Sequence, residues 1–160
     1  MTNSDKGDKI MSKVLIATYS WSGRTESVAQ KLKQIVEDAG MYKIEVPDNT
    51  FDQDMYKTDE IATAQINNNQ YPELVNEIPN PDQYDLILVG SPVWRGAPAT
   101  PVHTFLEKIQ NYSGKVASFY TDAGMANGYE ETFKQWAGNL NVLPAHEGSN
   151  NLTAWIKELN

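Results

Sequence analysis

The stretch KVLIATYSWSGRT at residues 13–25 decides the fold class. Its first part, Lys13–Thr18, is a short and almost continuous apolar run, which is typical of a strand buried on both faces of a parallel sheet. Its second part, Tyr19–Thr25, consists mainly of small polar residues and predicts a loop. Apolar residues then recur at helical spacing on one face: Val28, Leu32, Ile35, Val36 and Ala39.

The residues after this helix complete a crossover unit. Gly40 stands where a helix commonly stops, and Lys43–Val46 reads as a second strand that Pro47 closes. A strand, a loop, a helix and a second strand form a βαβ unit, whose strands are parallel and whose connection is right-handed.

The same alternation continues to the end of the chain. Further apolar strands are predicted at Asp85–Gly90, Lys115–Thr121 and Asn141–Leu143, each followed by a segment of helical periodicity. We therefore predict an α/β fold: a doubly wound, five-stranded parallel sheet of order 2-1-3-4-5, with helices on both faces in a three-layer sandwich. The acidic, Pro-punctuated segment 48–84 predicts irregular structure that contains a helix near Ile61–Gln65.

The amino-acid composition limits the number of domains and the kinds of site and partner to expect. The 160 residues fit one domain, which we assign to residues 12–160, after a flexible N-terminal extension at residues 1–11. The absence of cysteine excludes thiolate sites and disulfides, and two histidines far apart in the sequence disfavour a histidine-built metal site. The net charge of −8 disfavours nucleic acid and anionic membranes as partners. No segment has the length of a membrane span or the pattern of a signal peptide, so a cytoplasmic location is expected.

The predicted strand order also locates the ligand site. In an open α/β sheet, ligands bind beyond the carboxyl ends of the strands, where the strand order reverses. That point lies between the first and third strands, so the loops Tyr19–Thr25 and Ser91–Pro98 are expected to meet there, with Asp122–Tyr129 beside them.

The first of these loops has the chemistry of a phosphate cradle. Ser20, Ser22 and Thr25 supply hydroxyls, Gly23 permits a tight turn, and the following helix begins with free N–H groups. An ordinary capped connection between strand and helix explains the same residues about as well. The spacing of a Walker loop and the G-x-G-x-x-G dinucleotide pattern are both absent.

Aromatic residues and arginines gather in the same loops. Trp94, held between Pro and Gly at a strand end, suits stacking on a flat ring, and Trp21 and Tyr129 offer further aromatic faces. A packing role is the usual alternative for a loop tryptophan. The chain has only two arginines, Arg24 and Arg95, and both fall in the predicted ligand loops, where a guanidinium suits a phosphate or a planar ring.

Three segments carry a resemblance to a known family. TYSWSGRTE at residues 18–26 resembles the phosphate loop of flavodoxins, and GSPVWRGAP at residues 90–98 and TDAGMANG at residues 121–128 resemble their two flavin-ring loops. The resemblance implies one non-covalently bound FMN. It implies that the phosphate is held by Ser20, Ser22, Gly23, Arg24 and Thr25, and that the ring is surrounded by Pro92, Val93, Trp94, Arg95, Gly96, Thr121, Asp122, Ala123, Gly124 and Tyr129. Trp21 is expected among the cofactor-binding residues as a further aromatic face.

This sequence departs from the family pattern at three positions. Arg24 replaces the usual asparagine, Arg95 stands where relatives often carry a second aromatic, and Asp122 adds a carboxylate to the third loop. The resemblance implies a low-potential electron carrier, which would dock through its acidic surface on a basic redox protein or a flavoprotein reductase. The alternative on the same fold is an FMN-dependent NAD(P)H:quinone or related flavin reductase. A receiver-type signalling module is disfavoured, because Tyr19 and Ser20 stand where it needs an acidic cluster.

Overall fold

The computed structural model describes residues 13–121 and 126–159, so the expected flexible extension at residues 1–11 lies outside the described residues. Its centre is a parallel sheet that runs in the order β3-β2-β4-β6-β7. These strands are β2 (Val14–Thr18), β3 (Gly40–Lys43), β4 (Leu86–Trp94), β6 (Lys115–Thr121) and β7 (Asn141–Val142). In chain order this is 2-1-3-4-5, so the predicted fold class is confirmed.

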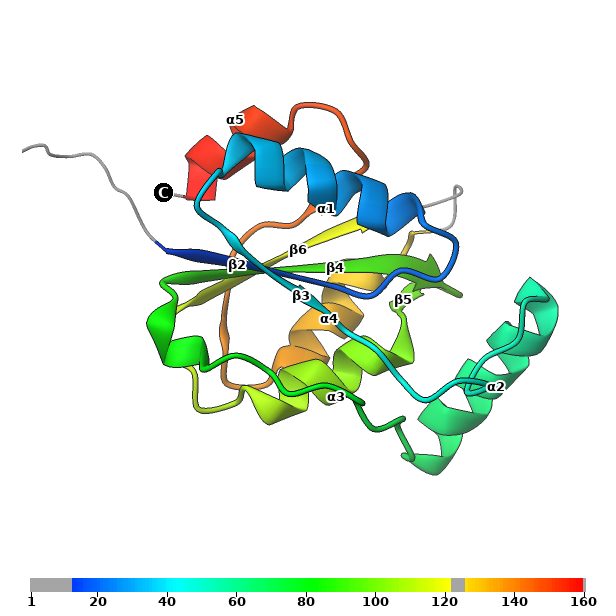
Figure 1. Cartoon of the computed structure of the whole chain (residues 1–160). Coiled ribbons are helices and arrows are strands. Elements are labelled where there is room, and N and C mark those ends of the chain that lie inside the picture. The colour runs from blue at the N-terminus through cyan, green and yellow to red at the C-terminus, as the bar shows by residue number, and fades with distance from the viewer. Residues whose placement is uncertain (1–12, 122–125, 160) are drawn as a thin grey trace, which may run out of the picture.

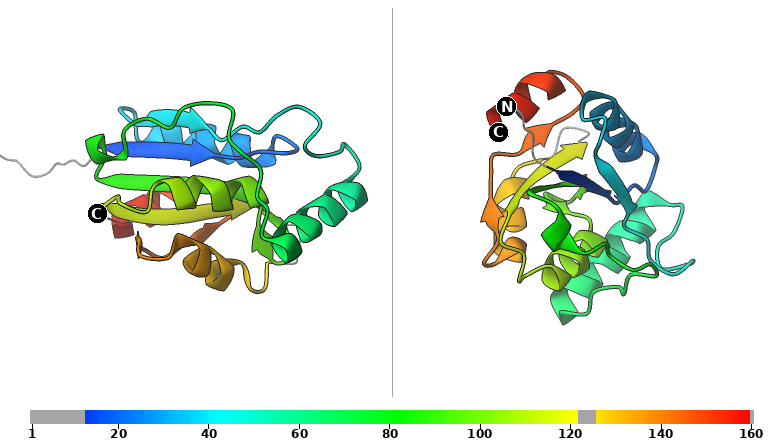
Figure 2. Two further views of the ribbon diagram at one scale, coloured as in Figure 1. Left: turned by 90° about the horizontal axis from the view of Figure 1, so that it is seen from below. Right: turned by 60° about the vertical axis from the view of Figure 1, so that its left-hand side comes forward.

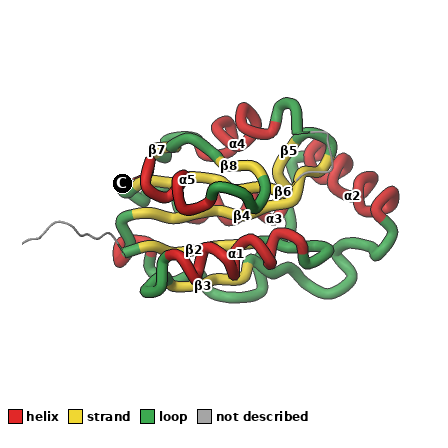
Figure 3. Tube along the Cα trace, turned by 90° about the horizontal axis from the view of Figure 1, so that it is seen from above, coloured by secondary structure: helices red, strands yellow, loops and turns green. Residues whose placement is uncertain are grey.

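Helices cover both faces of the sheet, as the predicted three layers require (Figure 1). One face carries α1 (Arg24–Ile35) and α5 (Leu152–Leu159), which lie side by side over the strands when the molecule is seen from above (Figure 3). The opposite face carries α3 (Thr100–Lys108) and α4 (Tyr129–Ala137).

The apolar strands fill two separate cores because their side chains alternate between the faces. Val14 and Ile16 pack with Leu32 of α1 and with Trp155 of α5. Leu15 and Ala17 belong to the larger core under α3 and α4, with members such as Phe105 and Phe133. A strand that is buried on both faces leaves only its ends open, so loops at those ends are where a ligand can approach.

The structure corrects the boundaries around β3. The predicted helix through Ala39 ends at Ile35, and the predicted strand Lys43–Val46 instead begins at Gly40 and ends at Lys43. The side chain of Tyr84 packs close to Gly40, because an added Cβ at residue 40 would lie 2.8 Å from the Tyr84 hydroxyl and would displace it.

The crossover from β3 to β4 contains helix, as expected for the segment 48–84. It forms α2 (Met55–Asn68), which is longer than the predicted helical stretch, and a short 3₁₀ turn, η1 (Pro81–Gln83). In Figures 1 and 2, α2 projects beyond the carboxyl ends of the strands instead of covering a sheet face. This crossover therefore brings a helix to the edge where the ligand loops are expected.

Two short strands extend the sheet. The fifth position is divided, because β7 and β8 (His146–Glu147) pair separately with the two ends of β6, and Pro144 lies between them. At the other end of β4, β5 (Ala97–Pro98) folds back antiparallel to its last residues.

Gly90 offers a test of the packing between β4 and β6. An added Cβ at residue 90 would overlap the ring of Phe119, which is completely buried. We expect Gly90→Ala to lower the free energy of unfolding by about 1–3 kcal/mol, as overpacked cores do, measured by urea unfolding. Adding Phe119→Leu should make the two changes non-additive, because the residues touch. Unchanged stability of Gly90→Ala would contradict this packing.

Candidate ligand site at the carboxyl edge of the sheet

The first loop, between β2 and α1, is held in a tight turn by hydrogen bonds to the side chain of Ser20. The Ser20 hydroxyl oxygen accepts hydrogen bonds from the backbone N–H groups of Gly23, at 3.1 Å, and of Glu26, at 3.2 Å. Gly23 has a φ of 96°, in the left-handed region, and apart from its chain neighbours no atom of residues 13–121 and 126–159 lies within 4 Å of the position of a Cβ there. The loop therefore turns tightly around the start of α1 and leaves open space at Gly23, where the helix dipole is positive.

Two threonine hydroxyls meet at the start of α1, and a third lies buried at the end of β2. The hydroxyls of Thr25 and Thr121 lie 2.8 Å apart and are hydrogen bonded, which joins the first loop to the end of β6. The side chain of Thr18 points to the sheet face that α1 covers, because Val14, Ile16 and Thr18 are spaced two residues apart along β2. Its buried Oγ1 has no hydrogen-bond partner among the described residues. A buried hydroxyl without a partner is costly, so the site has a donor left over.

The second loop is a hairpin, so the prediction of a loop over Ser91–Pro98 was wrong. β4 continues to Trp94 and returns as β5, with a two-residue turn at Arg95 and Gly96. Both turn residues have positive φ, 52° and 76°, as a type I′ turn requires. This turn was hard to predict, because Asn-Gly or Asp-Gly is the usual pair for it and arginine is rare there.

The hairpin turn lies against the third loop. A Cβ at Gly96 would lie 2.6 Å from the carbonyl oxygen of Asn127, and a Cβ at Gly128 would lie 3.3 Å from the carbonyl oxygen of Gly96. Both glycines therefore permit backbone to approach backbone. The predicted site residues Asp122, Ala123 and Gly124 lie outside the described residues.

The aromatic residues predicted to offer ring faces lie mostly in the core. Trp94 is 5% exposed and contacts Tyr19 and Phe51 edge to face, at centroid distances of 5.7 and 5.0 Å. Trp21 is half-buried, and its indole N–H donates to the carbonyl oxygen of Asp52 at 3.0 Å. The packing alternative thus describes Trp94 in this structure.

Tyr129 is completely buried and presents no surface to a ligand in this structure. Its ring stacks on Tyr120 at 4.2 Å, and its hydroxyl is hydrogen bonded to the hydroxyl of Ser118 at 2.9 Å. Ser118 in turn donates to the carbonyl oxygen of Val89. Tyr129 therefore supports β4 and β6 from below the third loop.

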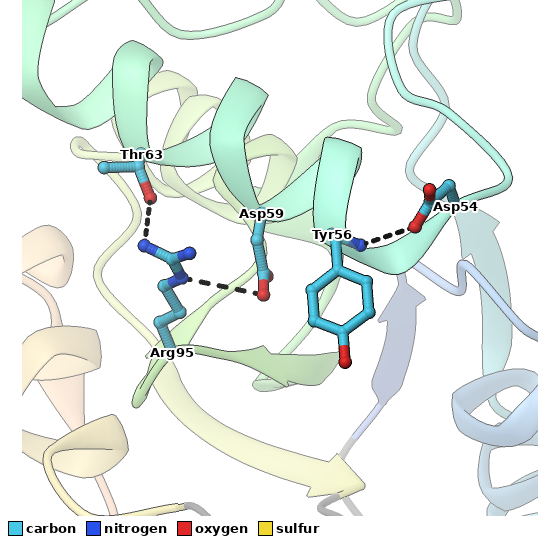
Figure 4. Close-up of polar contacts among 5 residues, drawn as sticks. All are labelled: Asp54, Tyr56, Asp59, Thr63 and Arg95. Carbon is cyan, nitrogen blue, oxygen red and sulfur yellow. Dashed lines mark hydrogen bonds and ion pairs between the residues drawn. The ribbon is translucent and has the colours of Figure 1, made fainter.

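Arg95 contacts α2, which the sequence analysis did not foresee. Its Nε lies 3.6 Å from Oδ2 of Asp59, and a terminal guanidinium nitrogen donates to the hydroxyl of Thr63 at 3.4 Å (Figure 4). Arg24, at the start of α1, is exposed. Of the two arginines predicted to face a ligand, one therefore holds the hairpin to α2.

The remaining predicted residues line the upper edge of β4. Pro92 and Val93 are half-buried, and Pro92 pairs with Thr121 in the sheet register. Ser22 is exposed at the tip of the first loop. The structure therefore brings the first loop, the hairpin and the end of β6 to one edge, as strand order predicted.

No group of three or more His, Cys, Asp or Glu side chains that could hold a metal ion occurs in residues 13–121 and 126–159. Within those same ranges, the longest apolar helices are too short or too polar to cross a bilayer.

The buried hydroxyl of Tyr129 predicts a pH dependence. Burial raises the pKa of Tyr129 well above its ordinary value of 10.0. The hydroxyl therefore stays protonated in the folded state, whereas it ionises near pH 10 in the unfolded chain. A folded-state pKa above the unfolded one gives stability that is complete below pH 10 and is lost as the pH rises further.

We expect Tyr129→Phe to be less stable than wild type by about 1 kcal/mol at neutral pH, because a buried hydrogen bond is lost. Above pH 10 the difference should shrink by about 1.4 kcal/mol per pH unit. Urea unfolding of both proteins between about pH 8 and 11 measures this, with Tyr56→Phe as the control, since Tyr56 is 81% exposed. Parallel curves for wild type and Tyr129→Phe would contradict the buried, protonated hydroxyl.

Comparison with known proteins agrees with this geometry. The chain matches the family model described as Flavodoxin over residues 13–159. A flavoprotein from Lactobacillus acidophilus NCFM, crystallised in complex with FMN, is 42% identical, and the match covers 91% of this chain and 99% of that one with a TM-score of 0.86. The flavodoxin of Megasphaera elsdenii, 18% identical with 85% of each chain covered and a TM-score of 0.52, shares the fold. The match over nearly the whole chain shows that this protein belongs to the flavodoxin family.

Proposed function

We propose that this protein binds one FMN non-covalently at the carboxyl edge of its sheet and transfers electrons with it. The observation that carries the proposal is the convergence of the first loop, the hairpin and the end of β6, joined by the hydrogen bond between Thr25 and Thr121. The FMN complex of the Lactobacillus acidophilus flavoprotein supports it, because that protein is 42% identical over nearly its full length.

The donors at the first loop fit a phosphate group. Gly23 leaves open space at the positive end of α1, Ser22 presents an exposed hydroxyl, and the buried hydroxyl of Thr18 has no partner among the described residues. The residues that would hold the phosphate are Ser20, Ser22, Gly23, Arg24 and Thr25, since the indole N–H of Trp21 is already donated to Asp52. Arg24 would add a full positive charge that neutral loops lack.

The hairpin and the end of β6 would border the ring. Pro92, Val93 and Gly96 present backbone and small side chains at this edge, and the resemblance adds Asp122, Ala123 and Gly124. Trp94 and Tyr129 would act from beneath, because both are packed in the core and hold β4 and β6 in place. Arg95 would fix the hairpin through Asp59.

When bound, FMN supplies the redox chemistry, and the protein binds it, orients it and sets the electrostatics around it. The formal net charge of −8 disfavours added negative charge on the flavin, which lowers its potential, and it favours a basic redox protein or a flavoprotein reductase as partner. These features support an electron carrier over a self-sufficient reductase.

Phosphate recognition can be tested with two flavins. We expect FMN to bind at least about tenfold more tightly than riboflavin, because only FMN offers a phosphate to charge-assisted hydrogen bonds. Ser22→Ala should weaken FMN binding and leave riboflavin binding unchanged, as measured by quenching of flavin fluorescence. Equal affinity for both flavins would argue against a phosphate site at the first loop, and no binding of either would refute the proposed function.

The carrier and the reductase differ in how they accept electrons. FMN-loaded protein mixed anaerobically with NADPH or NADH should stay yellow on the timescale of a stopped-flow experiment, and should bleach after a catalytic amount of a flavoprotein reductase is added. Rapid bleaching by the nicotinamide alone would favour the flavin reductase instead.

A further inference from the structure

Tyr56 is the most exposed large hydrophobic side chain of the described residues. It is 81% exposed, whereas the other seven tyrosines, all within the described ranges, are buried or half-buried. A single exposed aromatic is not unusual at a protein surface. The informative property of Tyr56 is therefore its position.

Tyr56 lies in the sequence between two residues that contact the ligand loops. Four residues earlier, the carbonyl oxygen of Asp52 accepts the indole N–H of Trp21 from the first loop. Three residues later, Asp59 pairs with Arg95 of the hairpin. The start of α2 therefore lies between the loop assigned to the phosphate and the hairpin assigned to the ring.

The orientation of Tyr56 follows from the helix. Tyr56, Asp59 and Thr63 are spaced i, i+3 and i+7, so they share one face of α2. Asp59 and Thr63 contact Arg95, which means that this face looks toward the hairpin. Figure 4 shows the ring of Tyr56 extending from α2 on the side where Arg95 lies, above the ends of the strands.

The start of α2 is also held in place. The side chain of Asp54 caps it by accepting the N–H of Tyr56 at 2.9 Å, and Asp54 in turn is fixed by an N–H donated to Asp52. Farther along, the hydroxyl of Thr100 donates to the side chain of Gln65. An aromatic ring on a fixed helix end loses little conformational entropy when a ligand packs against it.

We propose that Tyr56 is the side chain that covers the outer face of the isoalloxazine ring of FMN, and that Arg95 and Asp59 position it. This inference rests on the proposed function. Trp94 is too buried to stack on a flavin ring at this edge of the sheet. The crossover places another aromatic residue, Tyr56 of α2, at the same edge. A tyrosine ring prefers an offset stack on a flat conjugated ring.

The test compares FMN binding by wild type and two variants of this residue. Tyr56→Ala should raise the dissociation constant for FMN about three- to tenfold, the scale of an aromatic pair. It should also raise the residual fluorescence of bound FMN, because a contacting phenol ring quenches an excited flavin. Tyr56→Phe keeps the ring and should keep the affinity within about twofold, given that the ring supplies the contact.

Ile66→Ala is the matched control. Ile66 is 40% exposed on the same helix, ten residues or about 15 Å along its axis from Tyr56. This variant should bind FMN as wild type does, and circular dichroism should give all variants the same melting temperature. If wild type binds FMN and Tyr56→Ala binds it equally well with equal quenching, Tyr56 does not cover the ring, and the proposed function survives. If wild type does not bind FMN, both proposals fall.

Discussion

The parallel register of β2, β4 and β6 is the constraint on which the site depends. Thr18 of β2 pairs with Gly90, and Pro92 of β4 pairs with Thr121 of β6, so the ends of the three strands are fixed relative to one another by backbone hydrogen bonds. Because these strands are buried on both faces, a one-residue slip would move every buried side chain of the slipped strand to the opposite core. The arrangement of the loops thus follows from the cores, and the loop side chains need only add the chemistry.

The parts of the fold that were predictable are those whose burial is complete. β6 was predicted with the observed bounds, and β2 within one residue, because their apolar runs face helices on both sides. The strand β3 was predicted three residues too late, because it is an edge strand with alternating exposure and lacks a continuous apolar run. The residues predicted as strand are partly extended all the same, since the N–H of Val75 donates to the carbonyl oxygen of Glu45. The length of α2 escaped prediction because its contacts with the body are largely polar, including Asp59 with Arg95, and polar contacts leave no apolar stripe.

The residues of the candidate site also fall into a predictable group and an unpredictable one. The positions of Ser20 and Thr25 at the carboxyl edge of the sheet were predictable from sequence, because both residues follow a buried strand directly and their contacts are local or at a strand end. The burial of Trp94 was not predictable, since it depends on Phe51, a residue of the crossover segment whose position no local pattern reveals. Tyr56 was missed for the related reason that its significance arises only when α2 is seen beside the hairpin.

The divided fifth strand also bears on how the protein behaves at high concentration. An uninterrupted outer strand would offer a row of unpaired N–H and C=O groups on which another chain can add a strand and begin an aggregate. Here β7 and β8 contribute two residues each, and Pro144 between them has no N–H to donate. This border of the sheet is therefore a poor template for intermolecular β-pairing, and concentrated protein is offered no continuous strand here on which an aggregate can start.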